Sequence, residues 1–349
     1  GIISLAKSLP LIIRTFSDAM KSLKGNTNTN TTRTGQDINM GVILGGVLLI
    51  TIAIWLAPPI PVTFLGAIIV VIFGFFFATV SSRMVGLVGS SNNPVSGMAI
   101  ATLLIATILL KATGDSGIHG MQGAIAIGSI ICIVAAIAGD TSQDLKTGYL
   151  LGSTPKKQQI GEFIGVFAAA LAIGGVLYLL NAAWGFGSEE LGAPQAMLMK
   201  MIVEGVMENN LPWTLVFIGV FLAIAVEIVG IPVLPFAIGV YLPVQLNACI
   251  MVGGLVRLAF DKMNMKDKKK KDAIINDGVL YCSGMIAGEG LIGILLAVFA
   301  VFHVDKAIDL SSRLNLPASV SNIGSLVVFA LVILSLLKFS LWRKRKENK

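Results

Sequence analysis

Glu289 is the residue of this chain whose type and position most directly indicate chemistry. It lies near the middle of the apolar run Gly278–Phe302. A carboxylate at that depth of a bilayer costs about 3 kcal/mol, so it usually faces a cavity or a partner and can carry a proton. The alternative is a protonated acid that holds two helices together. Glu227, at the end of Leu211–Val229, has two similar interpretations: a proton-handling group beside a cavity, or an interfacial cap.

Two segments interrupt the apolar pattern with prolines and polar side chains. The first is Gly89–Gly97 (GSSNNPVSG) and the second begins at Gly230 with GIPVLPFAIGVYLPVQLNA. Amides and hydroxyls beside a broken helix suit recognition of peptide or carboxylate groups. The alternatives are an ordinary turn for the first segment and caps on broken helix ends for the second. The predicted substrate-binding residues are Ser91, Asn92, Asn93, Tyr241, Gln245 and Asn247.

The motifs of enzymes and nucleotide-binding proteins are missing or out of context. Gly288–Gly293 spells GxGxxG, but it lies inside an apolar run with no strand before it. Asp144–Gly148 (DLKTG) departs from the phosphorylated DKTGT of ion pumps by one leucine, and the sequence has no Walker A, HExxH or GxSxG pattern. The three cysteines form no CxxC pair. We therefore expect no catalytic residue, no metal site and no cofactor.

Long apolar runs must position these residues. Hydrophobic residues make up 55% of the chain, charged residues 13%, and the mean hydropathy is +0.85. About 20 apolar residues cross a bilayer. The sequence therefore predicts an all-α polytopic membrane protein, a helical bundle. The expected spans are Gly41–Leu56, Val62–Val88, Gly97–Ala112, Ile118–Ala138, Ile160–Ala183, Leu211–Val229, Gly278–Phe302 and Ile323–Trp342.

Basic residues in short loops set the predicted orientation. The tail RKRKENK, the loop Lys262–Asp272, the linker Ser17–Met40 and the loop Asp140–Gln159 are expected in the cytoplasm, and the acidic Gly185–Asn210 outside. Because these positive charges flank membrane spans, the net charge of +7 does not indicate nucleic-acid binding. The expected organisation is the end of a truncated membrane helix (1–16), a cytoplasmic linker (17–40), the bundle (41–342) and a basic tail (343–349).

Counting crossings between these fixed points requires Gly230–Phe260 to leave the cytoplasm and return. Its 31 residues are too few for two full helices, and Pro232, Pro235 and Pro243 break helices. We therefore expect a pair of half-spans or a re-entrant element there. Arg257, near the cytoplasmic end of that segment, is expected to snorkel or to pair with a carboxylate.

Several stretches resemble the oligopeptide transporter (OPT) family, which includes the yellow-stripe-like metal-chelate carriers, with the bacterial branch most similar. They are GIISLAKSLPLII at the start, LVGSSNNPVSGMAIATL from Leu87, GDTSQDLKTGYLLGSTPKKQQ from Gly139, EIVGIPVLPFAIGVYLP from Glu227 and AGEGLIG from Ala287. The resemblance implies a secondary active transporter in the bacterial inner membrane. Such a protein takes up short peptides or metal chelates together with protons.

The resemblance also implies that this chain supplies roughly the C-terminal half of an OPT-type fold. Its expected partners are the substrate, protons, the lipid bilayer, the N-terminal half and, as a further option, other copies of the chain. The alternatives are a membrane channel, or a half that does not transport without its partner half. An intramembrane enzyme would require a paired catalytic motif.

Overall fold

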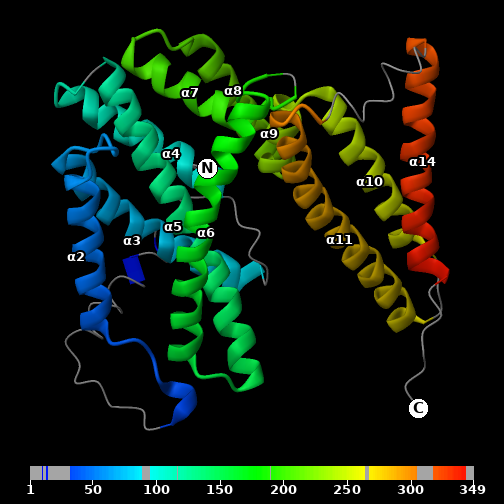
Figure 1. Ribbon diagram of the computed structural model, residues 1–349, viewed down its shortest axis with the longest axis horizontal. Helices are drawn as coiled ribbons and strands as arrows, with labels where there is room; N and C mark the ends of the chain where they lie inside the picture. Colours follow the sequence, from blue (N-terminus) through cyan, green and yellow to red (C-terminus); the bar gives the residue numbers. More distant parts are fainter. Residues whose placement is uncertain are drawn as a thin grey trace. The chain divides into compact units, whose positions relative to one another are not determined.

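The computed structural model describes residues 32–88, 95–115, 117–188, 190–263, 267–304 and 317–342, together with Pro10, Ile13 and Arg14. Within these ranges the chain is helical, with no strand (Figure 1). Seven of the described helices are long and apolar enough to cross a membrane. The prediction of an all-α polytopic protein is therefore confirmed. Most of the predicted helix tail and linker, and the basic tail, lie outside the described residues.

The chain forms two compact units and passes between them within α6, just before α7 and within α9. The first unit consists of residues 1–170 and 193–237, and the second of residues 171–192 and 238–349. In chain order the elements are η1 (Arg33–Gly35), α2 (Met40–Leu56), α3 (Phe64–Val88), α4 (Val95–Ala112), α5 (Gly117–Leu151), α6 (Pro155–Ala183), α7 (Pro194–Met207), α8 (Trp213–Val229), α9 (Val233–Tyr241), α10 (Val244–Lys262), α11 (Lys268–Val301) and α14 (Ala318–Trp342).

The centre of the first unit is α5, which packs against α3, α4 and α7. Helices α3 and α5 run in the same direction, since Gly66 lies against Ile127 and Gly74 against Ile131. Helix α4 runs antiparallel to α5, since Leu103 of α4 lies against Gly128 and Leu110 against Gly123. The connections α2–α3 and α4–α5 therefore share one end of the unit, and the α5–α6 turn lies at the other end.

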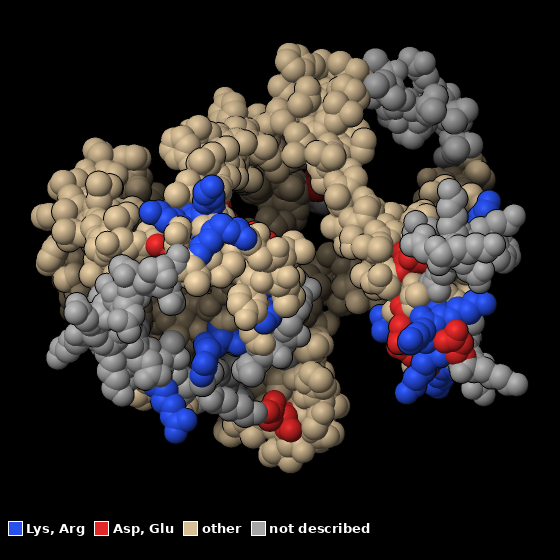
Figure 2. Space-filling model, turned by 90° about the horizontal axis from the view of Figure 1, so that it is seen from below, with Lys and Arg blue, Asp and Glu red and all other residues tan. Residues whose placement is uncertain are grey.

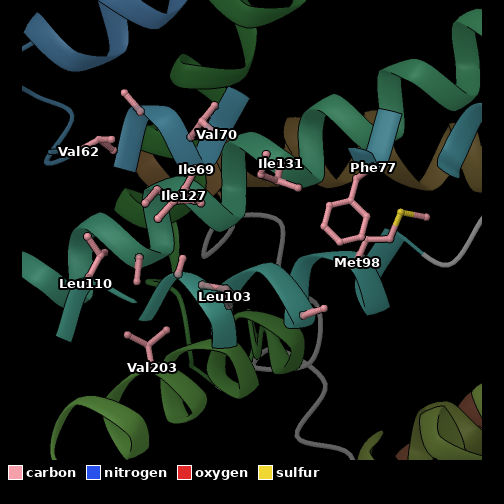
Figure 3. Packing of buried hydrophobic residues seen from close by; sticks show 14 of the residues in the cluster. Val62, Ile69, Val70, Phe77, Met98, Leu103, Leu110, Ile127, Ile131 and Val203 are labelled. Atoms are coloured by element: carbon pink, nitrogen blue, oxygen red, sulfur yellow. The ribbon is translucent and has the colours of Figure 1, made fainter. Parts of the chain in front are cut away.

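An apolar core holds these helices together. Phe77 of α3, Leu110 of α4 and Ile127 and Ile131 of α5 are almost completely buried, and Val203 joins them from α7 (Figure 3). Small residues bring the helices close. A Cβ atom on Gly128 would lie 2.6 Å from Leu103 Cγ. The core is thus built mainly from side chains at helical intervals on α3, α4, α5 and α7, and Ile54 of α2 also belongs to it.

Helices α5 and α11 extend furthest beyond the predicted spans. Helix α5 has 35 residues, about 50 Å at 1.5 Å per residue, so it continues through most of the expected loop Asp140–Gln159. This stretch contains no proline, and the helix ends where Gly152 adopts φ +74°. Helix α11 begins at Lys268, ten residues before the expected Gly278, with the Asp267 side chain accepting from Lys270 N at 3.3 Å. Both helices therefore continue into polar segments that were expected to be loops.

Residues just before α2 are attached to the α5–α6 turn. Arg33 donates to the hydroxyl of Thr154 at 3.2 Å, Lys156 N donates to Gln36 O at 3.0 Å, and Ile38 N donates to Gln159 Oε1 at 3.3 Å. Asn39 then caps α2 by accepting from Gly41 N at 2.8 Å. The end of the predicted flexible linker is thus fixed to the turn by contacts 121 residues apart in sequence.

The second unit contains α10, α11 and α14, and α11 packs against α14. Tyr281 donates or accepts a 2.8 Å hydrogen bond with Ser335, and its ring lies 5.0 Å from that of Phe339. Gly278 allows the close approach, because a Cβ atom there would lie 2.9 Å from Ser340 Oγ. This contact therefore joins the first half of α11 to the last two turns of α14.

Charged side chains gather where α10 meets α11 (Figure 2). Arg257 contacts both carboxylate oxygens of Asp261 at 3.1 Å, so the predicted carboxylate pairing is confirmed. Lys271 donates to Asp261 O at 2.5 Å. With the exposed run Lys268–Lys270, these residues form a basic cluster interleaved with acids.

The Gly230–Phe260 segment, expected to be a pair of half-spans or a re-entrant element, forms a short helix followed by a longer one. Helix α8 ends at Gly230, which has φ +82°. A nine-residue helix, α9, follows, and Pro243 then separates it from α10, which has 19 residues and is long enough to span a bilayer. The predicted breaks are present. The two parts are unequal because Pro235 sits in the first turns of α9, where proline is tolerated, and α10 contains no proline.

Candidate functional site

Glu289 lies in the interior of α11 with an exposed side chain. Its neighbours Gly288 and Gly290 are also open, since nothing lies within 4 Å of a Cβ atom built on either. Among the described residues, Glu289 has no hydrogen bond or ion pair. A carboxylate on an open helix face at membrane depth requires a polar environment. This face of α11 is therefore suited to contact a cavity or further protein.

The predicted binding residues near the α9–α10 break have different environments. Asn247 is half-buried, and its Nδ2 donates to Gly239 O at 2.9 Å and Leu242 O at 3.0 Å. These carbonyls belong to the end of α9, so Asn247 acts as a cap, which is the alternative interpretation of this residue. Gln245 is exposed on the first turn of α10, and Tyr241 ends α9. The backbone positions of all three residues therefore lie next to the α9–α10 break.

Glu227 is exposed in the last turn of α8, and its carbonyl accepts from Gly230 N at 3.1 Å. It belongs to the first unit, whereas Tyr241, Gln245, Asn247 and Glu289 belong to the second. Ser91, Asn92 and Asn93 lie outside the described residues. Their role as substrate contacts stays a prediction.

A cavity of about 390 Å³ opens at the α2–α3 end of the first unit, and it was not predicted from the sequence. It is lined by residues 55–63, which connect α2 to α3, and by His119 and Gln122 from the first two turns of α5. His119 Nδ1 lies 3.1 Å from Asp115 Oδ1, and His119 is 63% exposed while Asp115 is 19% exposed. Asp115 Oδ2 is buried and has no hydrogen-bond partner among the described residues.

Two glycines of α5 allow this arrangement. A Cβ atom on Gly120 would lie 2.1 Å from Asp115 O, and one on Gly123 would lie 2.6 Å from Pro61 O. The two loops therefore fold directly onto the helix next to His119 and Gln122. The sequence signal is the pattern His-Gly-Met-Gln-Gly at 119–123, in which each polar residue is followed at once by a glycine.

Helix α7 closes the same end of the unit. Lys111 donates to Val206 O at 2.5 Å and to Asn209 Oδ1 at 2.6 Å, which fixes the end of α7 to the end of α4. The Lys111 ammonium is thus engaged away from Asp115. The described part of the chain contains no group of three or more His, Cys, Asp or Glu residues that could hold a metal ion.

Comparison with known proteins identifies the family. The family model described as "OPT oligopeptide transporter protein" matches residues 2–300. The chain belongs to the OPT family. With seven apolar helices of spanning length among its described residues, this OPT chain is an integral membrane protein.

Named relatives come from bacteria, plants and yeast. A Haemophilus influenzae protein named as an oligopeptide transporter is 34% identical over 65% of this chain and 41% of its own length. An Oryza sativa protein named as a metal-nicotianamine transporter, YSL5, is 30% identical over 59% of this chain and 32% of its own. A Saccharomyces cerevisiae protein named as an oligopeptide transporter, YGL114W, is 24% identical over 76% of this chain and 38% of its own.

The OPT chain therefore spans about two fifths or less of the length of these relatives. No solved structure shows a significant match to it.

Proposed function

We propose that this chain is part of a secondary active transporter of the OPT type, which takes up short peptides or metal-chelate complexes together with protons. Membership of the family carries the proposal, and the names of the bacterial and plant relatives supply the two substrate classes. Because the chain spans at most about two fifths of these relatives, the transporting unit includes a further part that covers the open faces of these helices.

The proposed coupling residue is Glu289, with Glu227 as a second carboxylate. Glu289 has the required properties: it lies in the interior of a spanning helix, and its flanking glycines leave room for a partner. Substrate contacts are assigned to Ser91, Asn92, Asn93, Tyr241, Gln245 and Asn247. Broken helices free backbone groups that can meet a substrate, and the α9–α10 break has this form.

The proposed location is the bacterial inner membrane, with the C-terminus in the cytoplasm. Two loops that the sequence predicts on the cytoplasmic side lie at the same end of the first unit, since residues 33–38 contact residues 154–159. The Asp115 loop and the α2–α3 connection lie at the opposite end, on α5. The basic cluster at the start of α11 would then face anionic lipid on the cytoplasmic side.

Uptake into cells or proteoliposomes tests the proposal. A labelled dipeptide or a nicotianamine–metal complex should accumulate above its external concentration, and a protonophore should abolish the accumulation. A channel would only equilibrate the label, whatever the protonophore does. Absence of uptake by the chain together with the remaining part of a full-length relative, for both substrate classes, would contradict the proposal.

A further inference from the structure

We propose that the cavity between the α2–α3 connection and the start of α5 binds a protonated amino group of the substrate, as an entry site on the external side. This inference rests on the proposed transport function for its biological role. The binding itself is argued from the cavity's own chemistry, and each can fail without the other.

The wall formed by the α2–α3 connection offers hydrogen-bond acceptors and almost no donors. Pro58, Pro59 and Pro61 have no N–H group. The N–H groups of Ile60 and Val62 are already used within the connection, donating to Ala57 O at 3.0 Å and Ile60 O at 2.8 Å. Apart from the hydroxyl of Thr63, the polar surface of this wall therefore consists largely of carbonyl oxygens. Such a wall favours a ligand that brings its own N–H donors.

The opposite wall adds a further acceptor. An ionised Asp115 only accepts, so a neutral His119 in this contact carries its proton on Nδ1 and donates it to Asp115 Oδ1. His119 Nε2 is then the unprotonated nitrogen and can accept from a ligand. The negative charge of Asp115 also favours a cation, and the Lys111 ammonium is bonded to Asn209 and Val206.

Trp55 adds an aromatic ring to the lining of the cavity. Its ring packs edge-on against Phe64, with centroids 5.2 Å apart, and it is 46% exposed. An ammonium group over such a ring gains a cation–π attraction. Gln122 can accept or donate and suits a carbonyl next to the amine, as a peptide has. A metal ion is the weaker fit, since no group of three ligating residues occurs in the described ranges.

Fluorescence of Trp55 tests the site directly. The other three tryptophans, Trp184, Trp213 and Trp342, are replaced by phenylalanine, and the purified full chain is titrated with glycylglycine. We expect a saturable change in emission that N-acetylglycylglycine does not produce, because acetylation removes the charge. Equal responses to both peptides, or a response to neither, would overturn the assignment.

Two variants locate the binding. His119→Ala and Asp115→Asn should each weaken glycylglycine binding about tenfold or more, whereas Glu208→Gln, an exposed acid beyond α7, should leave it unchanged. If Asp115→Asn unfolds, two other measurements replace it: glycylglycine binding by Gln122→Leu, and competition between methylammonium and glycylglycine. Methylammonium should displace glycylglycine from the parent protein. Unchanged binding in folded His119→Ala would overturn the site.

Uptake measured on the same variants separates the two proposals. If His119→Ala loses amine binding while uptake at low substrate concentration keeps its rate, the cavity is not an entry site and the transport function stands. If amine binding is present but no substrate is accumulated, the transport function is contradicted and the binding site stands.

Discussion

The side-chain amide of Asn247, at the start of α10, donates a 2.9 Å hydrogen bond to the carbonyl oxygen of Gly239 in α9. A second bond reaches Leu242 O at 3.0 Å. The last carbonyls of a helix have no partner within that helix. Asn247 therefore stabilises a chain break in an apolar segment by satisfying the acceptors that Pro243 leaves open.

Replacing Asn247 with alanine should destabilise this break. We expect a loss of about 1 kcal/mol, because two acceptors lose a donor. Thermal unfolding in detergent measures it, with Gln245→Ala as the control, since Gln245 is exposed on the same turn of α10. An unchanged melting temperature in Asn247→Ala would mean that the cap contributes no stability.

Because α4 and α5 pack closely, we expect that adding a single methyl group between them lowers the stability of the protein strongly. Gly128→Ala would place Cβ 2.6 Å from Leu103 Cγ, and Leu103 is only 3% exposed. Overpacking of this kind costs about 1–3 kcal/mol. Gly45→Ala in α2 is the matched control, because nothing lies within 4 Å of its Cβ position and alanine favours a helix. Equal melting temperatures for the two variants would contradict the packing of the first unit.

The attachment of the linker predicts protection from proteolysis. Thr154→Val keeps the shape of a buried side chain but removes the oxygen that accepts from Arg33. Loss of a bond worth about 1 kcal/mol raises the open population about fivefold. Tryptic cleavage after Arg33, followed by mass spectrometry, should accelerate by that factor. Thr147→Val, an exposed threonine on α5, should not change the rate, and an equal rate in Thr154→Val would show that this bond does not hold the segment.

The sequence predicts the positions of the helices along the chain better than it predicts which helices pack against one another. The run Gly41–Leu56 differs from α2 by one residue, because apolar composition alone defines such a span. Helix α7 was not predicted, because the charged residues Lys200 and Glu204 interrupt its apolar sequence. Its helical form depends on burial of Val203 and Met207 against the core. The cavity was not predicted for a related reason: it depends on Pro61 meeting Gly123, residues far apart in sequence.

The coupling role of Glu289 predicts a selective loss of function. Glu289→Gln keeps the size and hydrogen-bonding capacity of the side chain but cannot release a proton, so accumulation against a gradient should fall to the background level. Because Glu289 is exposed and has no partner among the described residues, the melting temperature should change little. Asp272→Asn, an exposed carboxylate at the start of the same helix, should transport normally. Wild-type accumulation by Glu289→Gln would leave Glu289 with only a structural role, as a protonated acid between helices.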